Sequence, residues 1–593
     1  MTDSNENLGF DPEELAAKYK AERDKRLRTD GNDQYLHMHG QLARYIEDPY
    51  TERTERAPIE EDAEVVIMGG GFGGLLAAAR LKEAGVEDIR IIEKGGDFGG
   101  TWYWNRYPGA ACDTESYIYL PLLEELNYMP TEKYARRPEI FAHAQAIGRH
   151  YDLYPKAIFQ TAITEFRWDE DRSRWLTLTD RGDEIRARFV VMVPGHYQEP
   201  KLPGIAGVES FEGHSFHTSR WDFEYTGGDA LGGLDRLHDK RVGIIGTGAT
   251  AIQCVPHVAR SAKKLYVFQR TPSAVGERND QPTDPDWFNQ FKPGWQKRRM
   301  LNFTGVFAGR IGDADQVSDG WTKPFIEMLR SAAPDMSEEE RAEAFQLTDY
   351  KIMEGIRHRV EETVKDKQTA EALKPWYNRV CKRPCFHDDY LESFNNPNVE
   401  LVDTEGRGVE RITENAVIVG DKEYEVDCLI YATGFDLSQA AGFPVPIIGR
   451  HGEALSQKWK DGAISLHGFH THGFPNLLIM STIQSALDAN FPNMLEEQSR
   501  HIAYILSEAK KRGVTEIEVT EEAEEAWLEE HERHSHITIQ TWENCTPSYY
   551  NDEGHVSRHL ARNGAFGLGP LAFIDILEKW RADGKLEGLE LRK

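Results

Sequence analysis

The stretch EVVIMGGGFGGLLAAARLKEAG, residues 64–85, decides the fold class of this chain. Four apolar residues lead into a glycine run, and small and apolar residues suited to a helix follow it. The run fits G-x-G-x-x-G through Gly69, Gly71 and Gly74, in the order strand, turn, helix that is typical of a dinucleotide-binding βαβ unit. Glycines at these positions let backbone N–H groups approach a pyrophosphate at the positive end of the helix. We therefore expect a Rossmann-like unit here.

An acidic residue after the next predicted strand supports this interpretation. Glu93, in IRIIEK, lies 24 residues beyond Gly69. A carboxylate at this position accepts hydrogen bonds from ribose hydroxyls and repels a 2′-phosphate. The sequence thus predicts a dinucleotide without a 2′-phosphate, and the alternative is a plain glycine turn.

A second unit of the same kind begins at KRVGIIGTGATAIQCVPHVARSA, residues 240–262, with a turn of the form G-x-G-x-x-A. Arg270 lies 24 residues beyond Gly246, where the first unit has its glutamate. A guanidinium binds a 2′-phosphate in a forked geometry, so this site is predicted to prefer NADPH; a surface arginine beside an NADH site is the alternative. The residues expected at this cofactor are Thr247, Gly248, Ala249, Thr250, Ala251, Gln253, Arg270 and Thr271. Two sites of opposite charge indicate one flavin and one NADPH.

The composition excludes several classes of protein. The 593 residues are 39% hydrophobic and 28% charged, as in an ordinary globular protein of more than one domain. The net charge of −29 argues against a nucleic-acid partner, and no run of 18 apolar residues predicts a membrane span. The six scattered cysteines are expected to be reduced thiols, and the first residues lack the order of a secretory signal, so the predicted location is cytoplasmic. No residues have recognised metal-ligand spacing, so no metal is expected.

Two longer motifs carry a family resemblance. GGTWYWNRYPGAACD, residues 99–113, fits [A/G]-G-x-W-x4-[F/Y]-P-[G/M]-x3-D, and FEGHSFHTSRWD, residues 211–222, fits F-x-G-x3-H-x3-W-[P/D]. Together they resemble the type I Baeyer–Villiger monooxygenases, flavoproteins that convert ketones into esters or lactones. The resemblance extends from about residue 60 to the end of the chain.

The resemblance implies an α/β fold with two Rossmann-like dinucleotide-binding domains, one for FAD and one for NADP, and a helical insertion. The chain is predicted to divide into four parts: a mainly helical N-terminal extension at 1–60, which precedes the resemblance; a first part of the FAD-binding domain at 61–210; an NADP-binding domain at 211–425 with the insertion, whose residues have helical spacing, at about 285–378; and a second part of the FAD-binding domain, with the C-terminal region, at 426–593. Within the extension, Asp11 and Pro12 predict the start of a helix.

The resemblance also implies roles for individual residues. Arg383, in the Lys-Arg-Pro segment 382–384, would be the catalytic cation, oriented by Asp113. A permanent cation suits this role because negative charge develops on the former ketone oxygen. Lys382, Arg383 and Trp542 would also contact NADP. The implied FAD-binding residues are Gly69, Gly71, Gly74, Glu93, Thr101, Trp102, Asp113, Tyr119 and Met494.

The resemblance assigns the second motif to movement of the cofactor domains and not to the chemical reaction. Phe211, Gly213, His217 and Trp221 would belong to the linker that couples the two cofactor domains, so His217 is expected to govern domain movement and not proton transfer.

The predicted function is NADPH- and O2-dependent insertion of one oxygen atom beside a ketone carbonyl, through a C4a-peroxyflavin. The extension, with KRPCFHDDY and CTPSYYN, resembles the subgroup acting on cyclopentadecanone or hydroxyacetophenone, which favours cyclic or bulky ketones. One alternative is an N- or S-oxygenating flavin monooxygenase, which shares both glycine turns but lacks the motif at 99–113. Another is a non-enzymatic flavoprotein that signals its redox state to a partner. Monomer and homodimer both stay open.

Overall fold

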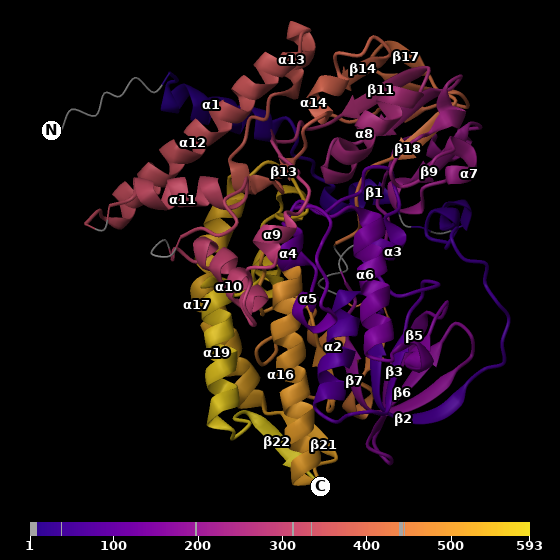
Figure 1. The fold of residues 1–593 in the computed structure, drawn as a ribbon, viewed down its shortest axis with the longest axis vertical. Helices are drawn as coiled ribbons and strands as arrows, with labels where there is room; N and C mark the ends of the chain where they lie inside the picture. The colour runs from indigo at the N-terminus through magenta and orange to yellow at the C-terminus, as the bar shows by residue number, and fades with distance from the viewer. Residues whose placement is uncertain are drawn as a thin grey trace.

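The computed structural model describes residues 9–36, 38, 40–195, 199–310, 314–333, 335–437, 443 and 445–593, except for the side chains of 41 and 536–538. Two sheets of mainly parallel strands organise this part of the chain, one above the other in the view of Figure 1. No helix among the described residues is long and apolar enough to cross a membrane.

The first sheet is built around β2 (Glu60–Met68), which pairs in parallel with β3 (Ile89–Ile92) and β7 (Glu184–Met192). Its full order is β19 (Ile447–Ile448), β5 (Ile163–Asp169), β6 (Arg174–Thr179), β7, β2, β3 and β4 (Ala157–Ile158), with β20 (Leu477–Ile479) also paired to β7. Strands that lie far apart in the sequence thus form one sheet.

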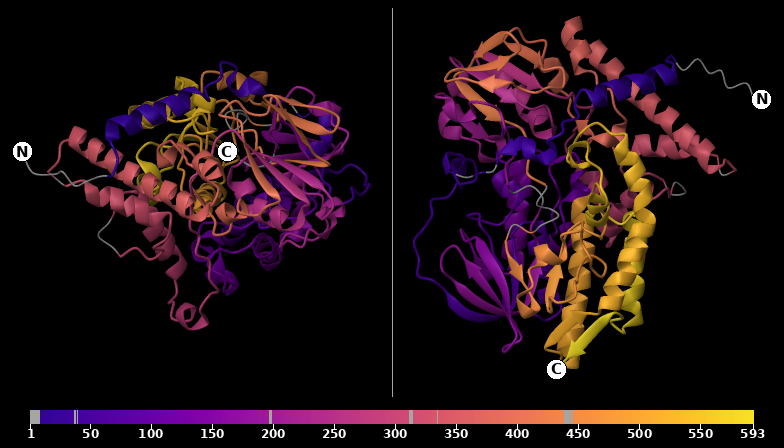
Figure 2. Two further views of the ribbon diagram at one scale, coloured as in Figure 1. Left: turned by 90° about the horizontal axis from the view of Figure 1, so that it is seen from above. Right: turned by 180° about the vertical axis from the view of Figure 1, so that it is seen from behind.

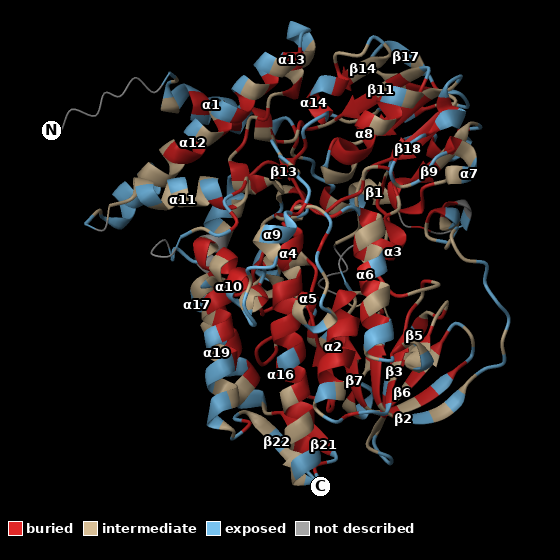
Figure 3. Ribbon diagram, viewed as in Figure 1, coloured by how far each residue is buried: buried red, intermediate tan, exposed pale blue. Residues whose placement is uncertain are grey.

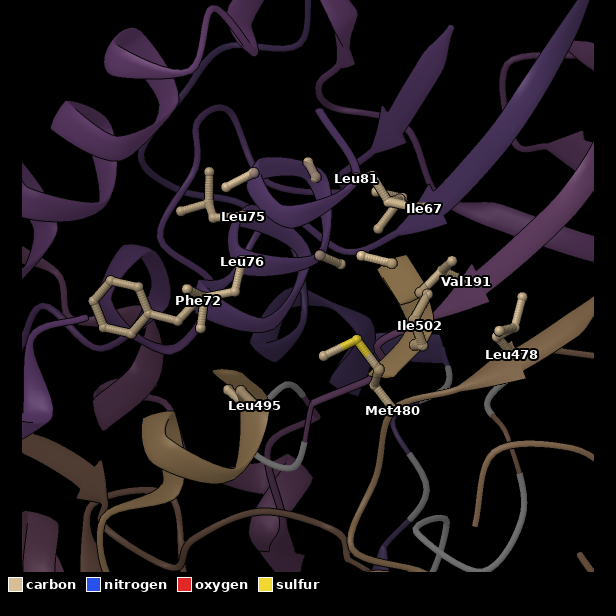
Figure 4. Close-up of a cluster of buried hydrophobic side chains, with 14 of the residues drawn as sticks. Ile67, Phe72, Leu75, Leu76, Leu81, Val191, Leu478, Met480, Leu495 and Ile502 are labelled. Carbon is tan, nitrogen blue, oxygen red and sulfur yellow. The ribbon is translucent and has the colours of Figure 1, made fainter. Parts of the chain in front are cut away.

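The hydrophobic core of the first unit lies around two helices. Helix α2 (Phe72–Glu83) begins directly after the glycine turn, and α16 (Phe491–Arg512) packs along it. Figure 4 shows Leu75 and Leu76 of α2 in the cluster that also contains Met480 and Leu495. Burial of such side chains contributes about 1.5–3 kcal/mol each. Figure 3 shows that both helices are largely buried.

The second sheet has the parallel order β14 (Val399–Asp403), β11 (Lys264–Gln269), β10 (Arg241–Ile245), β18 (Cys428–Tyr431) and β9 (His214–His217). Helix α8 (Ala249–Ser261) starts at its glycine turn. Because β18 pairs with β10, the chain leaves this unit after Tyr431 and not at the predicted boundary of 425. The apolar run at 428–431 fits either sheet, and only its pairing decides between them.

The predicted helical insertion contains α9 (Pro285–Phe288), α10 (Trp295–Phe307), α11 (Thr322–Ser331), α12 (Glu338–Thr363) and α13 (Lys367–Leu373). Helix α12 begins with a capping box formed by Ser337 and Glu340. In Figures 1 and 2, α11 and α12 project from one side of the molecule.

The N-terminal extension contains α1 (Pro12–Asp24), whose predicted cap is confirmed: Asp11 Oδ1 accepts hydrogen bonds from the backbone of Glu13 and Glu14, at 2.8 and 3.2 Å. Helix α1 packs on α12, where the Tyr19 ring meets the Tyr350 ring edge-on at 5.3 Å. The extension then crosses to the second unit and passes down the outer side of the molecule to β2, as Figure 1 shows.

One sequence prediction about the cysteines is wrong. Cys381 and Cys545 form a disulfide, with their Cα atoms 5.0 Å apart. The other four, Cys112, Cys254, Cys385 and Cys428, are free and buried. The paired cysteines are 164 residues apart in sequence, so their scattered spacing contained no sign of the pairing.

Candidate active site

A cavity of about 1100 Å³ lies against both glycine turns. The predicted residues on its wall are Gly69, Gly71, Glu93, Thr101, Trp102, Asp113, Tyr119, Thr247, Gly248, Ala249, Thr250, Gln253, Arg270, Thr271, Lys382, Arg383 and Trp542. The predicted residues that do not line it are Gly74, Ala251, Met494, Phe211, Gly213, His217 and Trp221. The cavity therefore brings together side chains from distant parts of the sequence.

The first glycine turn fits a dinucleotide. A Cβ atom on Gly74 would stand 1.9 Å from the carbonyl oxygen of Gly69, and one on Gly100 would stand 2.8 Å from the Cα of Gly71. The turn and the 99–113 motif therefore approach at backbone level, as a cradle for phosphate requires. None of the residues that the structure describes caps the N-terminus of α2 with its side chain, so the N–H groups there can bind a pyrophosphate.

Backbone groups of the same unit hold the side chain of Glu93 in place. Its carboxylate accepts hydrogen bonds from the backbone N–H groups of Gly70, at 2.6 Å, and Gly95, at 2.7 Å. Burial raises the pKa of Glu93, and these two hydrogen bonds oppose that shift. Each oxygen keeps a lone pair that can accept a hydroxyl proton.

Three aromatic residues of the 99–113 motif line the cavity, namely Trp102, Trp104 and Tyr107. The indole N–H of Trp102 donates to the hydroxyl of Tyr119 at 3.0 Å, and both side chains lie on the cavity wall. Met494 is instead buried in the core around α2, and Leu495 is its neighbour on the wall. Met494 thus lies one residue away from the cavity wall, and its contact with FAD stays a prediction.

The predicted catalytic pair is in contact. Arg383 donates from both terminal nitrogens to the carboxylate of Asp113, each bond 2.6 Å long. Asp113 is 5% exposed, so this forked pair is largely withdrawn from water. Burial alone would lower the pKa of Arg383, but the charge and hydrogen bonds of Asp113 outweigh it and raise the pKa well above its usual range. The guanidinium thus keeps its charge on the cavity wall.

Trp321 contacts both members of this pair, although no motif in the sequence marks it. Its indole N–H donates to the backbone oxygen of Asp113 at 2.9 Å, and its ring faces the Arg383 guanidinium 5.5 Å away. The cation lies within the range of a cation–π contact. Trp321 comes from the helical insertion, where its only sequence signal is a tryptophan outside an apolar pattern.

The second glycine turn also suits a dinucleotide. Gly248 is the N-cap of α8; among the described residues no side chain caps this helix, and a Cβ atom on Gly248 would meet none of their atoms within 4 Å beyond its chain neighbours. Gln253 of α8 donates to the backbone oxygen of Ala111 at 2.9 Å and accepts from the Tyr107 hydroxyl at 2.8 Å. The 99–113 motif therefore bridges the two units.

Positive charge gathers near this turn. Arg270 and Lys382 both line the cavity. Burial, with repulsion from Arg270, lowers the pKa of Lys382 to about 8. Arg270 contacts two residues that were not predicted from the sequence. Its terminal nitrogens donate to Gln34, at 2.9 Å, and to Glu553, at 3.2 Å. These partners come from opposite ends of the chain and leave no local pattern around Arg270.

The linker motif lies away from the cavity wall. His217 is fully buried, and its Nδ1 lies 2.8 Å from the hydroxyl of Ser219. Burial lowers the pKa of His217 to about 3, so the ring is neutral near pH 7. The indole of Trp221 donates to Thr226 at 3.0 Å. These contacts join the motif to its surroundings in the fold and not to the cavity.

Trp542 joins the cavity to the C-terminal region. It lies near the end of α17 (Glu521–Glu543), and its ring is 5.0 Å from that of Tyr550. The disulfide between Cys381 and Cys545 anchors the chain just beyond it, next to Lys382.

Comparison with known proteins defines the class of this chain. Residues 67–129 match the family model described as an NAD(P)-binding Rossmann-like domain. The chain is 48% identical to a Baeyer–Villiger monooxygenase of Stachybotrys chlorohalonatus, over 99% of this chain and 95% of that protein. It is similar in structure to the polycyclic ketone monooxygenase of Thermothelomyces thermophila, with a TM-score of 0.92, 39% identity and coverage of 98% and 99%. The chain belongs to the Baeyer–Villiger monooxygenase family.

Among individual proteins, the chain is similar to neopentalenolactone D synthase of Streptomyces avermitilis, with 52% identity over 98% of this chain and 100% of that protein. The predicted fold class and cofactors, FAD and NADPH, are confirmed. The chain is an FAD-dependent enzyme that uses NADPH and O2 to insert oxygen beside a ketone carbonyl, and this activity is favoured over N- or S-oxygenation and over a non-enzymatic role.

Proposed function

We propose that this enzyme oxidises bulky cyclic ketones with Arg383 as its catalytic cation and Asp113 as the residue that orients it. The observation that carries the proposal is the forked ion pair of these two residues, 2.6 Å at both contacts, on the wall of a cavity that reaches both glycine turns. FAD would lie against the turn at 69–74 and NADPH against the turn at 246–251. The 2′-phosphate would bind Arg270 and Lys382.

When bound, reduced FAD activates O2 and supplies the oxygen atom that the ketone receives. Arg383 provides a positive charge that burial does not remove, and so stabilises negative charge on the ketone oxygen as it develops. Asp113 fixes the plane of the guanidinium through its forked contact, and the Trp321 ring lies 5.5 Å from the guanidinium. The charge is in place before the reaction and needs no reorganisation during it.

The substrate class is inferred from the apolar part of the wall. Phe307, Phe325 and Trp321 of the helical insertion line the cavity, together with Leu487 and Tyr549, which are 51% and 38% exposed. Large exposed apolar side chains at a cavity are typical of a binding site for an apolar ligand. The names of two similar proteins, a polycyclic ketone monooxygenase and neopentalenolactone D synthase, agree with a ring-containing substrate.

The test combines a substrate panel with a charge variant. The purified protein is assayed for NADPH oxidation with small cyclic, macrocyclic, aryl and polycyclic ketones, and the products are identified by mass spectrometry. We expect lactone from polycyclic ketones and a loss of about 100- to 1000-fold in Arg383→Ala, the usual cost of removing one preorganised charge partner. FAD content should stay unchanged.

Arg260→Ala is the matched control, because Arg260 also pairs with an aspartate, Asp389, but lies on the exposed side of α8. Normal lactone yield from Arg383→Ala would remove Arg383 from its role. Lactone from small ketones alone would remove the proposed substrate class.

We also place the enzyme in the cytoplasm, where metabolism regenerates NADPH. The disulfide bears on this proposal, because cytoplasmic glutathione keeps most protein thiols reduced. A thiol count on protein isolated under acid quench decides whether Cys381 and Cys545 are paired in cells.

A further inference from the structure

A buried carboxylate occupies the positively charged part of the cavity near the second turn. Glu553 lies in the short turn η10 (Asp552–Gly554) and is 4% exposed. Its Oε2 lies 3.2 Å from a terminal nitrogen of Arg270, and its Oε1 lies 3.4 Å from the Nζ of Lys201. All three side chains line the cavity.

The charge of Glu553 is stabilised by its surroundings. Burial acts to raise its pKa, but Arg270, Lys201 and Lys382 outweigh burial and lower the pKa below its usual value. Glu553 is therefore ionised near pH 7. It is one anion among three cations, at the place where the proposed function puts the 2′-phosphate.

The two ends of the chain fix this carboxylate. Asn32, in η1 (Gly31–Gln34), donates to the side chain of Asp552, and the imidazole of His555 lies 2.8 Å from the backbone oxygen of Arg28. The turn that carries Glu553 is thus fastened to the N-terminal extension on both sides.

The same extension reaches the guanidinium itself. Gln34 accepts a hydrogen bond from the second terminal nitrogen of Arg270 at 2.9 Å. Each terminal nitrogen already donates one hydrogen bond, so a phosphate at the forked end of Arg270 competes with Gln34 and Glu553 for the guanidinium. Glu553 is the one it would also repel, since both carry negative charge.

We propose that Glu553 is the internal counter-ion of the 2′-phosphate subsite: it holds Arg270 in the absence of cofactor and is displaced when a 2′-phosphate binds. Glu553 thereby lowers the affinity of the site for 2′-phosphate ligands, and its displacement removes one of the contacts that hold the C-terminal turn. This inference rests on the proposed binding of the 2′-phosphate by Arg270.

The test measures binding and not turnover. Binding of 2′,5′-ADP and of 5′-ADP to the full-length, FAD-loaded protein is measured by calorimetry for wild type, Glu553→Gln and Asp552→Asn. Glu553→Gln should bind 2′,5′-ADP about tenfold more tightly, because one like-charge contact is removed. Its affinity for 5′-ADP, which lacks the 2′-phosphate, should not change.

Asp552→Asn is the matched control, since it removes the same charge one residue earlier, from a side chain that faces Asn32. Equal or weaker binding of 2′,5′-ADP by Glu553→Gln would overturn the inference, as would equal tightening in Asp552→Asn. FAD content and the thermal midpoint establish that each variant is folded.

A measurement on wild type serves if Glu553→Gln does not hold FAD. Hydrogen exchange of the peptide spanning residues 546–556 should become faster with 2′,5′-ADP and stay unchanged with 5′-ADP. Slower or unchanged exchange with 2′,5′-ADP would overturn the inference.

The variant Arg270→Ala distinguishes failure of the proposed function of Arg270 from failure of the counter-ion role of Glu553. If Arg270→Ala still prefers 2′,5′-ADP over 5′-ADP, then the proposed function of Arg270 fails. If that preference is lost but Glu553→Gln behaves as wild type, then only the counter-ion role fails.

Discussion

The two glycine turns have the same backbone plan and obtain their charged residues in different ways. Glu93, beside the first turn, is held by N–H groups of Gly70 and Gly95, within 25 residues of chain. Arg270, beside the second turn, is held by Gln34 and Glu553, from the two ends of the chain. The charged residue of the first turn is thus held within its own unit, and that of the second turn is held by segments from outside its unit.

The largest effect should come from packing at the first turn. In Gly74→Ala, the new methyl group would stand 1.9 Å from the carbonyl oxygen of Gly69, which is backbone and cannot rotate away. We expect loss of FAD and of most soluble holoprotein. The second turn tolerates Ala251 at the corresponding position, so the two turns differ in how closely strand and helix approach.

Gly248→Ala is the matched control, because its Cβ would lie more than 4 Å from every atom outside its own chain neighbours in the described part of the chain. The FAD-to-protein absorbance ratio measures both variants. A normal ratio in Gly74→Ala would show that the first turn is not the tight element we describe.

The next effect concerns the charge that distinguishes the two sites. Arg270→Ala should raise the apparent KM for NADPH about 100-fold and change that for NADH far less, because only NADPH has a phosphate for the guanidinium. Steady-state kinetics with both coenzymes gives the comparison, with Arg260→Ala as the surface control. Equal changes for the two coenzymes would contradict the 2′-phosphate assignment.

The parts of the molecule that could be predicted from sequence are those fixed by local geometry. The glycine turns follow from the need for close backbone approach, and the start of α1 follows from a capping aspartate. The contact of Arg383 with Asp113 could be inferred only through a family motif, because 270 residues separate them.

The missed residues share a different property. Trp321, Gln34 and Glu553 reach the cavity from the helical insertion and the two ends of the chain, and their roles depend on the tertiary placement of those segments. A single glutamate or tryptophan in a loop has no periodicity or spacing that marks it. The disulfide of Cys381 with Cys545 was missed for the same reason.

That disulfide gives a smaller and separable effect on the second site. It ties the segment before Lys382 to the C-terminal region, whereas the one cysteine of the 99–113 motif, Cys112, is free. Replacing Cys381 and Cys545 by alanine should lower the thermal midpoint by several degrees, since a native disulfide stabilises by about 2–4 kcal/mol. Affinity for 2′,5′-ADP should fall severalfold, with FAD content unchanged.

Replacement of two free cysteines, Cys254 and Cys428, by alanine is the control for loss of buried sulfur. Differential scanning fluorimetry and calorimetry follow both proteins. A double variant at 381 and 545 with wild-type melting and binding would show that the cross-link does not support the second site.

The smallest effect is a pH dependence confined to the second site. The pKa of Lys382 is lowered to about 8 by burial and by Arg270, so its ammonium is present below pH 8 and lost above it. A bound 2′-phosphate favours the ammonium, so affinity for 2′,5′-ADP should be constant from pH 7 to 7.5 and fall about fivefold by pH 9.5. The other groups that act on Lys382 do not titrate in this window: Arg270 and Arg26 carry permanent charge, Glu553 is already ionised, and burial raises the pKa of the Cys385 thiol to about 11. Binding of 5′-ADP should be flat across the same range, and Lys382→Met should bind 2′,5′-ADP weakly at every pH. A fall in affinity that persists in Lys382→Met would assign the titration to another group and would remove the lysine from the phosphate subsite.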